Sequence, residues 1–307
     1  MISEAVIQAI KEYTKEENIH LNEPMAGCTT FRVGGPADCL VEIREKEDLR
    51  ELCRYFHLAE IPYFILGNGS NLLVSDQGFR GVILRIAAGM NDVKVLGNRI
   101  VAQAGATMAQ VARVAWENGL TGLEFASGIP GTVGGGVVMN AGAYGGEMKQ
   151  VVTNVEVLAK DGEFWNLDNE TMEFGYRTSV IRGQSYVVTE VEFTLQQGDP
   201  VQIKATMDEL AAKRREKQPL EYPSAGSTFK RPEGHFAGEL IMNAGLRGYR
   251  VGGAQVSNKH CGFVVNIAPG ITTAQDVLQV IRHCQEAVKE QFEVDLETEV
   301  ILLGEFQ

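Results

Sequence analysis

A run of glycines constrains this chain more than any other feature of its sequence. Residues 127 to 146 read SGIPGTVGGGVVMNAGAYGG, with eight glycines in twenty positions. Glycine adopts positive φ freely and lets a ligand or another stretch of backbone approach closely, but inside a helix or strand it costs roughly 0.5 to 1 kcal/mol relative to alanine. The run therefore predicts a backbone surface built for close contact.

The remaining composition is that of a globular protein. Of 307 residues, 44% are hydrophobic and 22% charged, and the length favours about two domains. Acidic residues outnumber basic ones by 40 to 28, a net charge of -12, which argues against a broad nucleic-acid-binding surface. The N-terminal segment lacks a signal-peptide pattern, and no apolar run approaches the ~20 residues of a membrane span. We expect a cytoplasmic protein that binds neither nucleic acid nor membrane.

The cysteines indicate neither disulfides nor a metal site. There are five, an odd number, and no C-x-x-C pair occurs. Cys284 lies at helical spacing from Leu278 and Ile281, and free cysteine usually behaves as a small buried hydrophobe. We therefore expect buried free thiols and no metal.

Hydrophobic periodicity in the first part of the chain indicates strands and helices in alternation. Residues 29 to 43 are predicted to form a turn-bounded pair of strands. Residues 45 to 60 are predicted to form a helix with an apolar stripe at Leu49, Leu52 and Phe56.

The later part of the chain shows a different order. Residues 151 to 195 alternate apolar and polar side chains, which is typical of antiparallel strands. A charged helix from about residue 200 ends before Pro219, and another long helix, opened by Thr272 or Thr273, precedes a terminal strand. The pattern predicts an α+β chain with a domain boundary near residue 200.

Glycine loops often bind nucleotides, but the standard phosphate-binding motifs are missing. The chain has no Gly-Lys dipeptide, hence no G-x-x-x-x-G-K-[ST] loop, and no G-x-G-x-x-G. Two loops remain, GNGSN at 67 to 71 and GIPGTVGGG at 128 to 136. Exposed N–H groups in such turns bind anions, so together they suit one dinucleotide. The alternative is two tight connections between strands.

Six segments, in order and at family-like spacing, resemble the UDP-N-acetylenolpyruvoylglucosamine reductase (MurB) family. They are TTFRVGGPAD at 29 to 38, LGNGSNLL at 66 to 73, GIPGTVGGGVVMNAGAYG at 128 to 145, FGYRTS at 174 to 179, PSAGSTFKRP at 223 to 232 and LETEVILLGE at 296 to 305. The resemblance covers the chain from about residue 24 to its end. FGYR runs directly into a strand pattern, so the chain is similar to the shorter class, without a tyrosine-bearing insertion.

This resemblance implies an α+β fold with bound FAD. A two-subdomain FAD-binding domain of the vanillyl-alcohol-oxidase-like (PCMH) type is expected over residues 1–200, its subdomains approximately 1–90 and 91–200. A C-terminal substrate-binding domain is expected over 201–307. The implied reaction uses NADPH to reduce UDP-N-acetylglucosamine enolpyruvate to UDP-N-acetylmuramate in peptidoglycan precursor synthesis, and no obligate protein partner is indicated.

The resemblance also assigns chemistry to three side chains. Arg177 offers a planar, permanently charged fork to the substrate carboxylate. Ser227 matches the proton donor to C2, although a bare glycine-serine pair is usually a turn. Glu297 matches the carboxylate that orders Arg177 or polarises the intermediate. Glu299 projects from the same strand face, and only the motif position favours Glu297 over it.

Binding residues follow from the same motifs. Substrate contacts are predicted at Tyr176, Arg215 and Lys217, although a solvated helix end explains the last two equally well. Near Ile181 the family pattern has an aromatic residue, and we expect this departure to affect packing more than chemistry. Cofactor-binding residues are predicted at Gly67, Asn68, Gly69, Ser70, Asn71, Ser127, Gly128, Ile129, Pro130, Gly131, Gly134, Gly135, Asn140, Ala141 and Gly142.

Two other functions stay open at this point. One is a flavin oxidase of the same superfold acting on a sugar or alcohol, and the other is a flavin-binding protein without turnover. Fold cannot separate the three, because sites carry function. The joint occurrence of Arg177, Ser227 and Glu297 in their family contexts favours the reductase.

Overall fold

The computed structural model describes residues 2 to 87 and 89 to 306, and the chain divides into two compact units. The first unit comprises the chain up to Leu21, Cys39–Gly67 and Gly81–Lys213, and the second comprises Asn22–Asp38, Asn68–Arg80 and the chain from Arg214. Each unit contains its own hydrophobic core. The domain boundaries predicted near residues 90 and 200 come from the sequence pattern and the family resemblance, whereas the two units are defined by their compactness. The predicted boundaries therefore stay predictions.

The helices predicted over residues 45 to 60, from about residue 200 and from Thr272 or Thr273 are confirmed, and the structure adds one that no local signal predicted. The α-helices of the described residues are α1 (Glu4–Tyr13), α2 (Lys46–Leu58), α3 (Met108–Glu117), α4 (Val133–Val138), α5 (Pro200–Lys217), α6 (Ala237–Asn243) and α7 (Ala274–Phe292). Thr273, rather than Thr272, caps α7 in a reciprocal capping box with Asp276. The addition is α4, which lies inside the glycine run.

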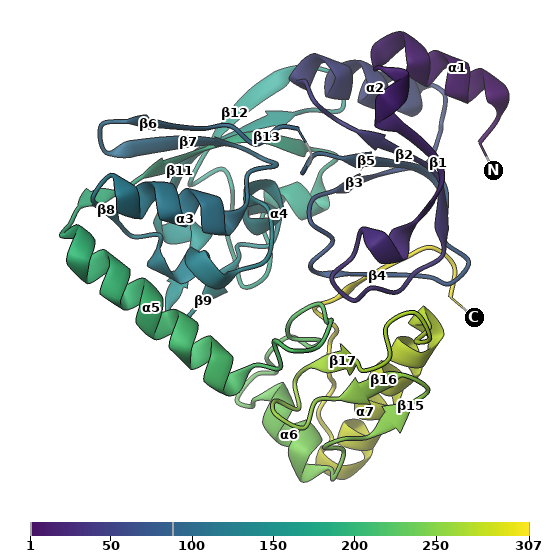
Figure 1. Ribbon diagram of the computed structural model, residues 1–307, viewed down its shortest axis with the longest axis vertical. Helices are drawn as coiled ribbons and strands as arrows, with labels where there is room; N and C mark the ends of the chain where they lie inside the picture. The colour runs from purple at the N-terminus through teal and green to yellow at the C-terminus, as the bar shows by residue number, and fades with distance from the viewer. Residues whose placement is uncertain (1, 88, 307) are drawn as a thin grey trace. The chain divides into compact units, whose positions relative to one another are not determined.

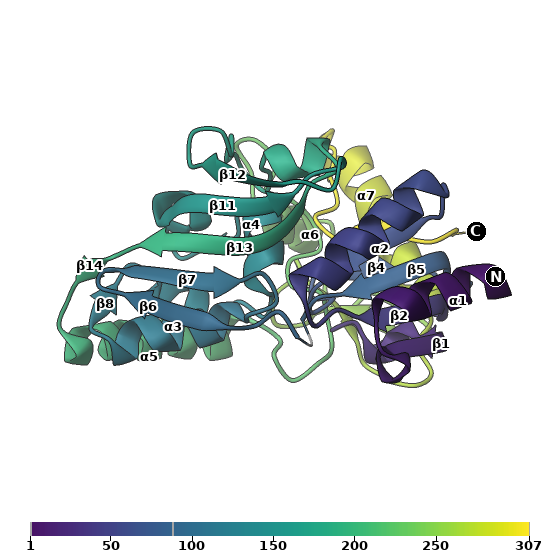
Figure 2. The ribbon, with the colours of Figure 1, turned by 90° about the horizontal axis from the view of Figure 1, so that it is seen from above.

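The first unit is built on a five-stranded antiparallel sheet. Its strands are β12 (Phe164–Asp168), β11 (Val152–Leu158), β13 (Val187–Thr194), β7 (Arg99–Gln103) and β6 (Val93–Leu96), in that order across the sheet. The antiparallel strands predicted over residues 151 to 195 are confirmed. Helices α3 and α4 pack on this sheet (Figure 1, Figure 2). The part of the glycine run that forms α4 is therefore held against the sheet.

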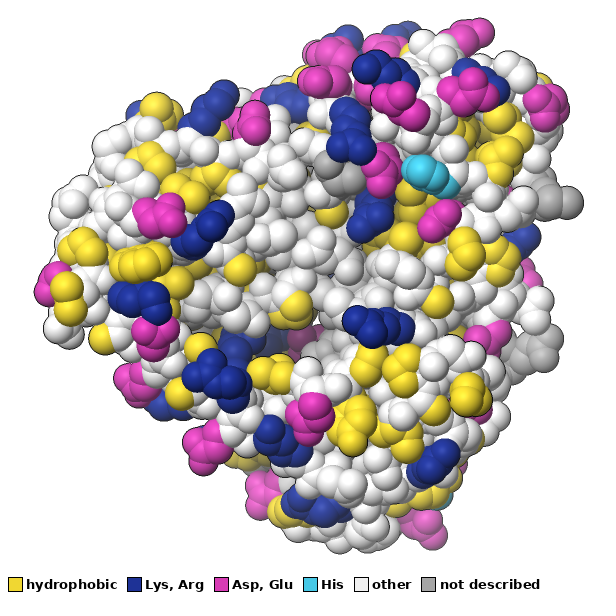
Figure 3. Space-filling model, in the orientation of Figure 1, with side chains coloured by type: hydrophobic (Ala, Val, Ile, Leu, Met, Phe, Trp, Pro, Cys, Tyr) yellow, Lys and Arg dark blue, Asp and Glu magenta, His cyan; other side chains and the backbone are white. Residues whose placement is uncertain are grey.

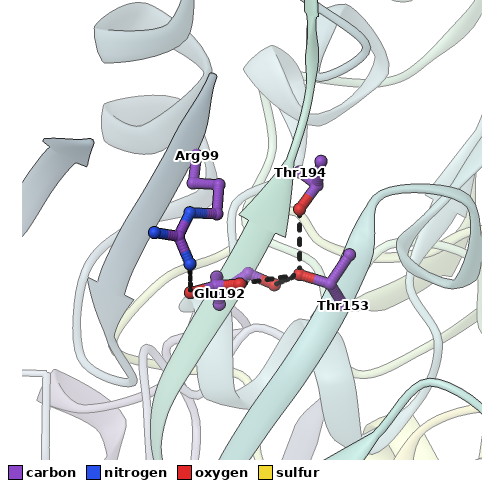
Figure 4. A network of polar contacts seen from close by, with 4 residues as sticks. All are labelled: Arg99, Thr153, Glu192 and Thr194. Atoms are coloured by element: carbon purple, nitrogen blue, oxygen red, sulfur yellow. Dashed lines mark hydrogen bonds and ion pairs between the residues drawn. The ribbon is translucent and has the colours of Figure 1, made fainter. Parts of the chain in front are cut away.

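A bulge in β11 is held by side chains from three neighbouring strands. The register of β11 against β13 shifts at Thr153. The Thr153 hydroxyl donates to Glu192 Oε1 at 3.2 Å and lies 3.1 Å from the hydroxyl of Thr194, while Arg99 Nη1 donates to Glu192 Oε2 at 3.2 Å (Figure 4). Such exposed polar contacts contribute little stability each, but together they specify the register.

A second sheet has the order β1-β2-β5-β3. Its strands are β1 (Ile19–Pro24), β2 (Pro36–Glu42), β5 (Phe79–Arg85) and β3 (Tyr63–Leu66), and the division into units falls within the first three. Strand β3 runs parallel to β5 and ends at Leu66, directly before the GNGSN loop. The predicted stripe on α2 is buried. Two short pairs, β8 (Leu120–Thr121) with β14 (Gln196–Gln197) and β9 (Gly142–Ala143) with β10 (Gly146–Glu147), complete the first unit.

The prediction of two strands over residues 29 to 43 is wrong in its first half. Only β2 forms there. Residues 29 to 33 form a turn instead, because Arg32 has a φ of 55 and the Thr29 hydroxyl donates to the Val33 carbonyl at 3.1 Å.

The second unit packs a small antiparallel sheet against two helices. The sheet contains β15 (Arg250–Val251), β16 (Ala254–Val256) and β17 (Val264–Asn266), and residues of α6 and α7 share its core. Separately, β18 (Ile301–Leu303) pairs in parallel with β4 (Leu72–Val74). The terminal strand is thus confirmed, although it begins later than the sequence pattern suggests.

The cysteines and charges follow the expectations from composition. All five cysteines are buried and free, and burial raises the pKa of Cys53 and of Cys284 to about 12. Basic and acidic side chains are interspersed on the face shown in Figure 3. No α-helix among the described residues is long and apolar enough to cross a bilayer.

Asp76 provides a test of how the second unit is held together. Its carboxylate accepts hydrogen bonds from the N–H groups of Ala274 at 2.7 Å and Gln275 at 2.9 Å, at the N-terminus of α7. Asp76→Ala removes both acceptors, so we expect the free energy of unfolding to fall by about 1 to 2 kcal/mol, measured by urea denaturation. The control Asp295→Ala, which removes an exposed ion pair with Lys289, should stay within about 0.5 kcal/mol. Equal effects would contradict the capping role.

Candidate functional site

The glycine run is anchored by main-chain hydrogen bonds to the segment that directly follows β7. The Val133 N–H donates to the Ala106 carbonyl at 2.8 Å, and the Gly134 N–H donates to the Ala104 carbonyl at 2.9 Å. Thr132 caps α4, because its hydroxyl accepts from the Gly135 N–H at 3.3 Å. The loop before α4 is therefore fixed in position.

Two glycines of α4 serve internal packing. A Cβ at Gly134 would lie 2.9 Å from the Cβ of Ala104, and a Cβ at Gly136 would lie 2.9 Å from the sulfur of Met108. Both glycines are buried, whereas Gly135 is exposed. Close contact is thus confirmed for the run, but part of that contact is with the protein itself.

The second glycine loop follows β3. Gly67 lies against Thr132, since a Cβ there would overlap the Thr132 hydroxyl. Gly69 has a φ of +59, and a Cβ at this position would collide with the carbonyl of Cys28. Asn71 forms two hydrogen bonds. Its side-chain amide donates to the Glu299 carbonyl at 2.9 Å, and its main-chain carbonyl accepts from the Ile301 N–H at 3.0 Å.

Each glycine loop has backbone N–H groups that are available to an anion. Within the described part of the chain, the N–H groups of Gly69, Ser70 and Gly131 have no hydrogen-bond acceptor. Backbone donors left without partners in tight turns form anion-binding concavities. Each loop by itself thus has donors for a phosphate group, and the assignment of these loops to FAD stays a prediction.

Arg177 lies in a strained turn of the first unit. Gly175 and Thr178 form an antiparallel bridge, with N–H to carbonyl distances of 3.1 and 3.4 Å, and Arg177 has a φ of 56. A positive φ at the third position of a turn is normally supplied by glycine or asparagine, and an L-residue there costs roughly 1 to 2 kcal/mol. The guanidinium lies 5.1 Å from the ring centroid of Tyr176, which is 55% exposed.

Residues 180 to 182, where the sequence departs from the family pattern, have a structural role. Ile181 is buried in the core of the first unit, within the short 3-10 helix Val180–Gly183. Arg182 Nη1 donates to the Arg177 carbonyl at 3.0 Å. The segment therefore supports the Arg177 turn as well as the core.

In the second unit, Ser227 directly precedes Thr228, which is held by hydrogen bonds of its backbone and its hydroxyl. Gly226 has a φ of +75 and turns the chain, and Ser227 is partly buried. Thr228 donates from its N–H to the Gly262 carbonyl at 2.8 Å, and its hydroxyl accepts from the Val264 N–H at 2.9 Å. The serine hydroxyl is thus carried by a backbone with little freedom to move.

The segment that carries Glu297 and Glu299 is joined to the Ser227 turn. The Lys230 N–H donates to the Glu297 carbonyl at 2.8 Å, and the Glu299 N–H donates to the Thr228 carbonyl at 2.9 Å. The Glu297 side chain is 72% exposed and forms an ion pair with Lys230. Glu299 is only partly exposed. The second unit thus brings together three motifs, GNGSN, PSAGSTFK and LETEV.

His260 supports the Ser227 turn through Gly262. Its Nδ1 accepts from the Gly262 N–H at 3.1 Å, and Gly262 in turn binds Thr228. Burial lowers the pKa of His260, so the ring is neutral near physiological pH. The histidine therefore acts as a hydrogen-bond acceptor there, without a charge.

The basic residues at the end of α5 differ in their surroundings. Arg215 and Lys217 are exposed, and the Arg215 carbonyl accepts from Lys259 Nζ at 2.6 Å. Arg214, one residue earlier, is 9% exposed. Arg214 is not among the predicted site residues, although a buried arginine is unusual enough to mark a position of interest.

An open cleft is lined by none of the predicted site residues. It belongs to the first unit and has a volume of about 700 Å³. Arg54, Lys160, Trp165 and Tyr186 are among its lining residues.

Fold and sequence matches define the class of protein first. A model of the FAD binding domain matches residues 37–168, and a model of the C-terminal domain of UDP-N-acetylenolpyruvoylglucosamine reductase matches residues 218–303. A glucose dehydrogenase, Phl p 4.0202, shares the fold with a TM-score of 0.51 at 13% identity, over 64% of this chain and 45% of that one. The chain is an FAD-binding protein, and the predicted α+β fold class is confirmed.

Close relatives then give the family. The chain is 49% identical over 304 residues to the UDP-N-acetylenolpyruvoylglucosamine reductase of Caldanaerobacter subterraneus subsp. tengcongensis, covering 99% of this chain and 100% of the relative. It is 47% identical over 305 residues to that of Exiguobacterium sibiricum, covering 99% of each. The crystal structure of the Thermus caldophilus enzyme matches with a TM-score of 0.79 and 37% identity, over 93% of this chain and 98% of that chain. This chain belongs to the UDP-N-acetylenolpyruvoylglucosamine reductase (MurB) family.

Gly69 offers a test of the cofactor loop. Gly69→Ala combines an unfavourable φ with a collision against the Cys28 carbonyl, so the loop must shift. We expect the purified variant to retain several-fold less FAD, read from the ratio of flavin to protein absorbance. Gly97→Ala is the matched control, since Gly97 has a φ of +66 but open space around a Cβ. It should lose about 1 kcal/mol of stability and keep its FAD, and equal flavin content in both variants would contradict the loop's role.

Proposed function

We propose that this chain catalyses the NADPH-dependent reduction of UDP-N-acetylglucosamine enolpyruvate to UDP-N-acetylmuramate, a step of peptidoglycan precursor synthesis. The observation that carries the proposal is the 49% identity to a relative of that name over 99% of this chain. Bound FAD supplies the hydride relay between NADPH and C3 of the enolpyruvyl group. The side chains of this protein must then hold the charge that develops and deliver a proton to C2.

Arg177 is proposed to hold the developing charge. Hydride addition at C3 leaves an enolate-like charge shared between C2 and the carboxylate. A guanidinium meets a carboxylate with two parallel N–H donors and never loses its charge. Preorganised donors of this kind are worth about 2.7 to 4 kcal/mol each. The turn that fixes the Arg177 backbone supports this role.

Ser227 is proposed to protonate C2. A hydroxyl is a weak acid, so it serves only when a strongly basic centre forms beside it and its position supplies the advantage. The hydrogen bonds that fix Thr228 on three sides provide that positioning.

Exposure favours Glu299 over Glu297 as the carboxylate of the mechanism. Glu297 is largely solvated and already paired with Lys230, and a carboxylate in water has weak electrostatic influence on a reacting group. Glu299 is shielded, and its backbone is bonded on both sides, to Thr228 and Asn71. Both glutamates stay candidates until they are compared directly.

Binding roles complete the proposal. The residues of the two glycine loops hold FAD, and Tyr176, Arg215 and Lys217 contact the sugar nucleotide. The protein acts in the cytoplasm on a small molecule, without nucleic acid and without an obligate protein partner.

Anaerobic stopped-flow absorbance tests the reaction as a whole. NADPH should bleach the flavin, and the enolpyruvyl sugar nucleotide should restore its colour without oxygen. Reoxidation by oxygen alone would indicate an oxidase, and bleaching without reoxidation by this substrate would remove the reductase proposal.

Ser227→Ala separates the two halves of the reaction. We expect bleaching by NADPH to stay within about twofold of the unmodified protein, while reoxidation by substrate slows by about 10²- to 10⁴-fold because the proton donor is lost. Single-mixing stopped flow measures both rates. Equal loss in both halves would show that the serine is structural.

Glu297→Gln and Glu299→Gln form a matched pair, since each removes one charge and keeps the side-chain volume. We expect Glu299→Gln to slow reoxidation by about 10²-fold or more, and Glu297→Gln to change it less than about threefold, as expected for an exposed pair. The reverse result would restore Glu297 to the mechanism.

A further inference from the structure

Asn140, within the glycine run, has an unusual environment. It is 2% exposed and has a φ of 45. Its amide nitrogen donates to the Gly175 carbonyl and to Glu147 Oε2, each at 3.0 Å, and its amide oxygen accepts from the Lys149 N–H at 2.9 Å. All of these residues belong to the first unit.

The side chain has no donor left for a ligand. A carboxamide has two N–H donors, and both are occupied by protein acceptors. Sequence reasoning placed Asn140 among the cofactor contacts, but its side chain is directed to protein groups. The function of Asn140 therefore depends on the protein groups that its side chain binds.

What it holds is the turn that presents Arg177. Gly175 is the first residue of that turn, and its N–H and carbonyl close the bridge with Thr178. Asn140 binds the same carbonyl from outside the turn. The Glu147 carboxylate orients the amide for this contact, and it is a strong acceptor because it is charged.

We propose that Asn140 is a positioning residue for Arg177, holding the Gly175–Thr178 turn so that the guanidinium meets the substrate carboxylate. The inference rests on the proposed function of Arg177. Displacement of a charged group by about 1 Å is enough to slow a reaction by about 10²-fold. Two other contacts act on the same segment, Arg182 on the Arg177 carbonyl and the Ser179 hydroxyl on the Val138 carbonyl at 2.9 Å, but neither reaches Gly175.

The test separates positioning from cofactor binding and from general stability. Asn140→Gly removes the amide while keeping a residue that accepts a left-handed φ. We expect flavin content and NADPH bleaching to be unchanged within about twofold, and reoxidation by substrate to slow by about 10- to 100-fold. Asn140→Asp keeps the volume but replaces the donors by acceptors, and it should show the same split.

Ligand affinity supplies a readout that does not depend on turnover. UDP-N-acetylmuramate carries the carboxylate that Arg177 would bind, whereas UDP-N-acetylglucosamine lacks it. By isothermal titration calorimetry, Asn140→Gly should weaken binding of the first by about 5- to 20-fold and leave the second unchanged. In an Arg177→Lys background the same substitution should add less than about threefold, because contacting groups are not additive.

The control is Asn169→Ala. Asn169 also ties backbone segments through its amide, donating to the carbonyls of Lys149 at 2.8 Å and Val152 at 2.7 Å, but it does not contact the turn. It should lower stability without changing the ligand ratio or the reoxidation rate. Loss of FAD in Asn140→Gly, unchanged reoxidation and affinity, or the same changes in Asn169→Ala would each overturn the inference. If the unmodified protein neither binds UDP-N-acetylmuramate nor is reoxidised by substrate, the proposed function fails instead.

Discussion

The segment of residues 297 to 301 is the constraint on which the second unit depends. Its backbone bonds the Ser227 turn through Lys230 and Thr228 on one side and the GNGSN loop through Asn71 on the other. These partners are separated by more than 60 and more than 220 positions in the sequence. One stretch of backbone therefore fixes both the GNGSN loop, which is proposed to bind FAD, and the turn of Ser227, the proposed proton donor. A shift of this stretch would displace both.

The glycine run combines two physical requirements that the sequence alone does not separate. At Gly134 and Gly136 the absent side chain lets a helix lie against Ala104 and Met108, and this packing offsets the low helix propensity of glycine. At Gly135, which is exposed, a Cβ would meet only the Thr132 hydroxyl, at an ordinary contact distance of 3.5 Å, so a ligand can approach the backbone there. A substitution in the run therefore has different consequences at adjacent positions.

Sequence reasoning succeeded where the determining contacts are local. The stripe on α2 and the cap at Thr273 depend on residues within one or two turns, and both were predictable. The turn at residues 29 to 33 was missed, because Thr, Phe and Val favour strands while Arg32 adopts a left-handed φ. Helix α4 was missed for the opposite reason, since its stability comes from Ala104 and Met108, about thirty residues away. The motifs predicted the site residues, but the different exposure of Glu297 and Glu299 arises from tertiary packing that no motif contains.

The strain at Arg177 connects the glycine run to the chemistry. Glycine at that position would relieve the strain in φ but would remove the guanidinium, and strain of this kind persists only where the surrounding structure enforces it. Asn140, itself at positive φ, supplies part of that enforcement from within the run. A turn held in this way keeps its charged group in position before substrate arrives, and little reorganisation is then needed when charge develops. The run therefore does more than offer backbone to a cofactor, because Asn140 within it also supports the turn of Arg177, the residue proposed to hold the charge that develops on the substrate.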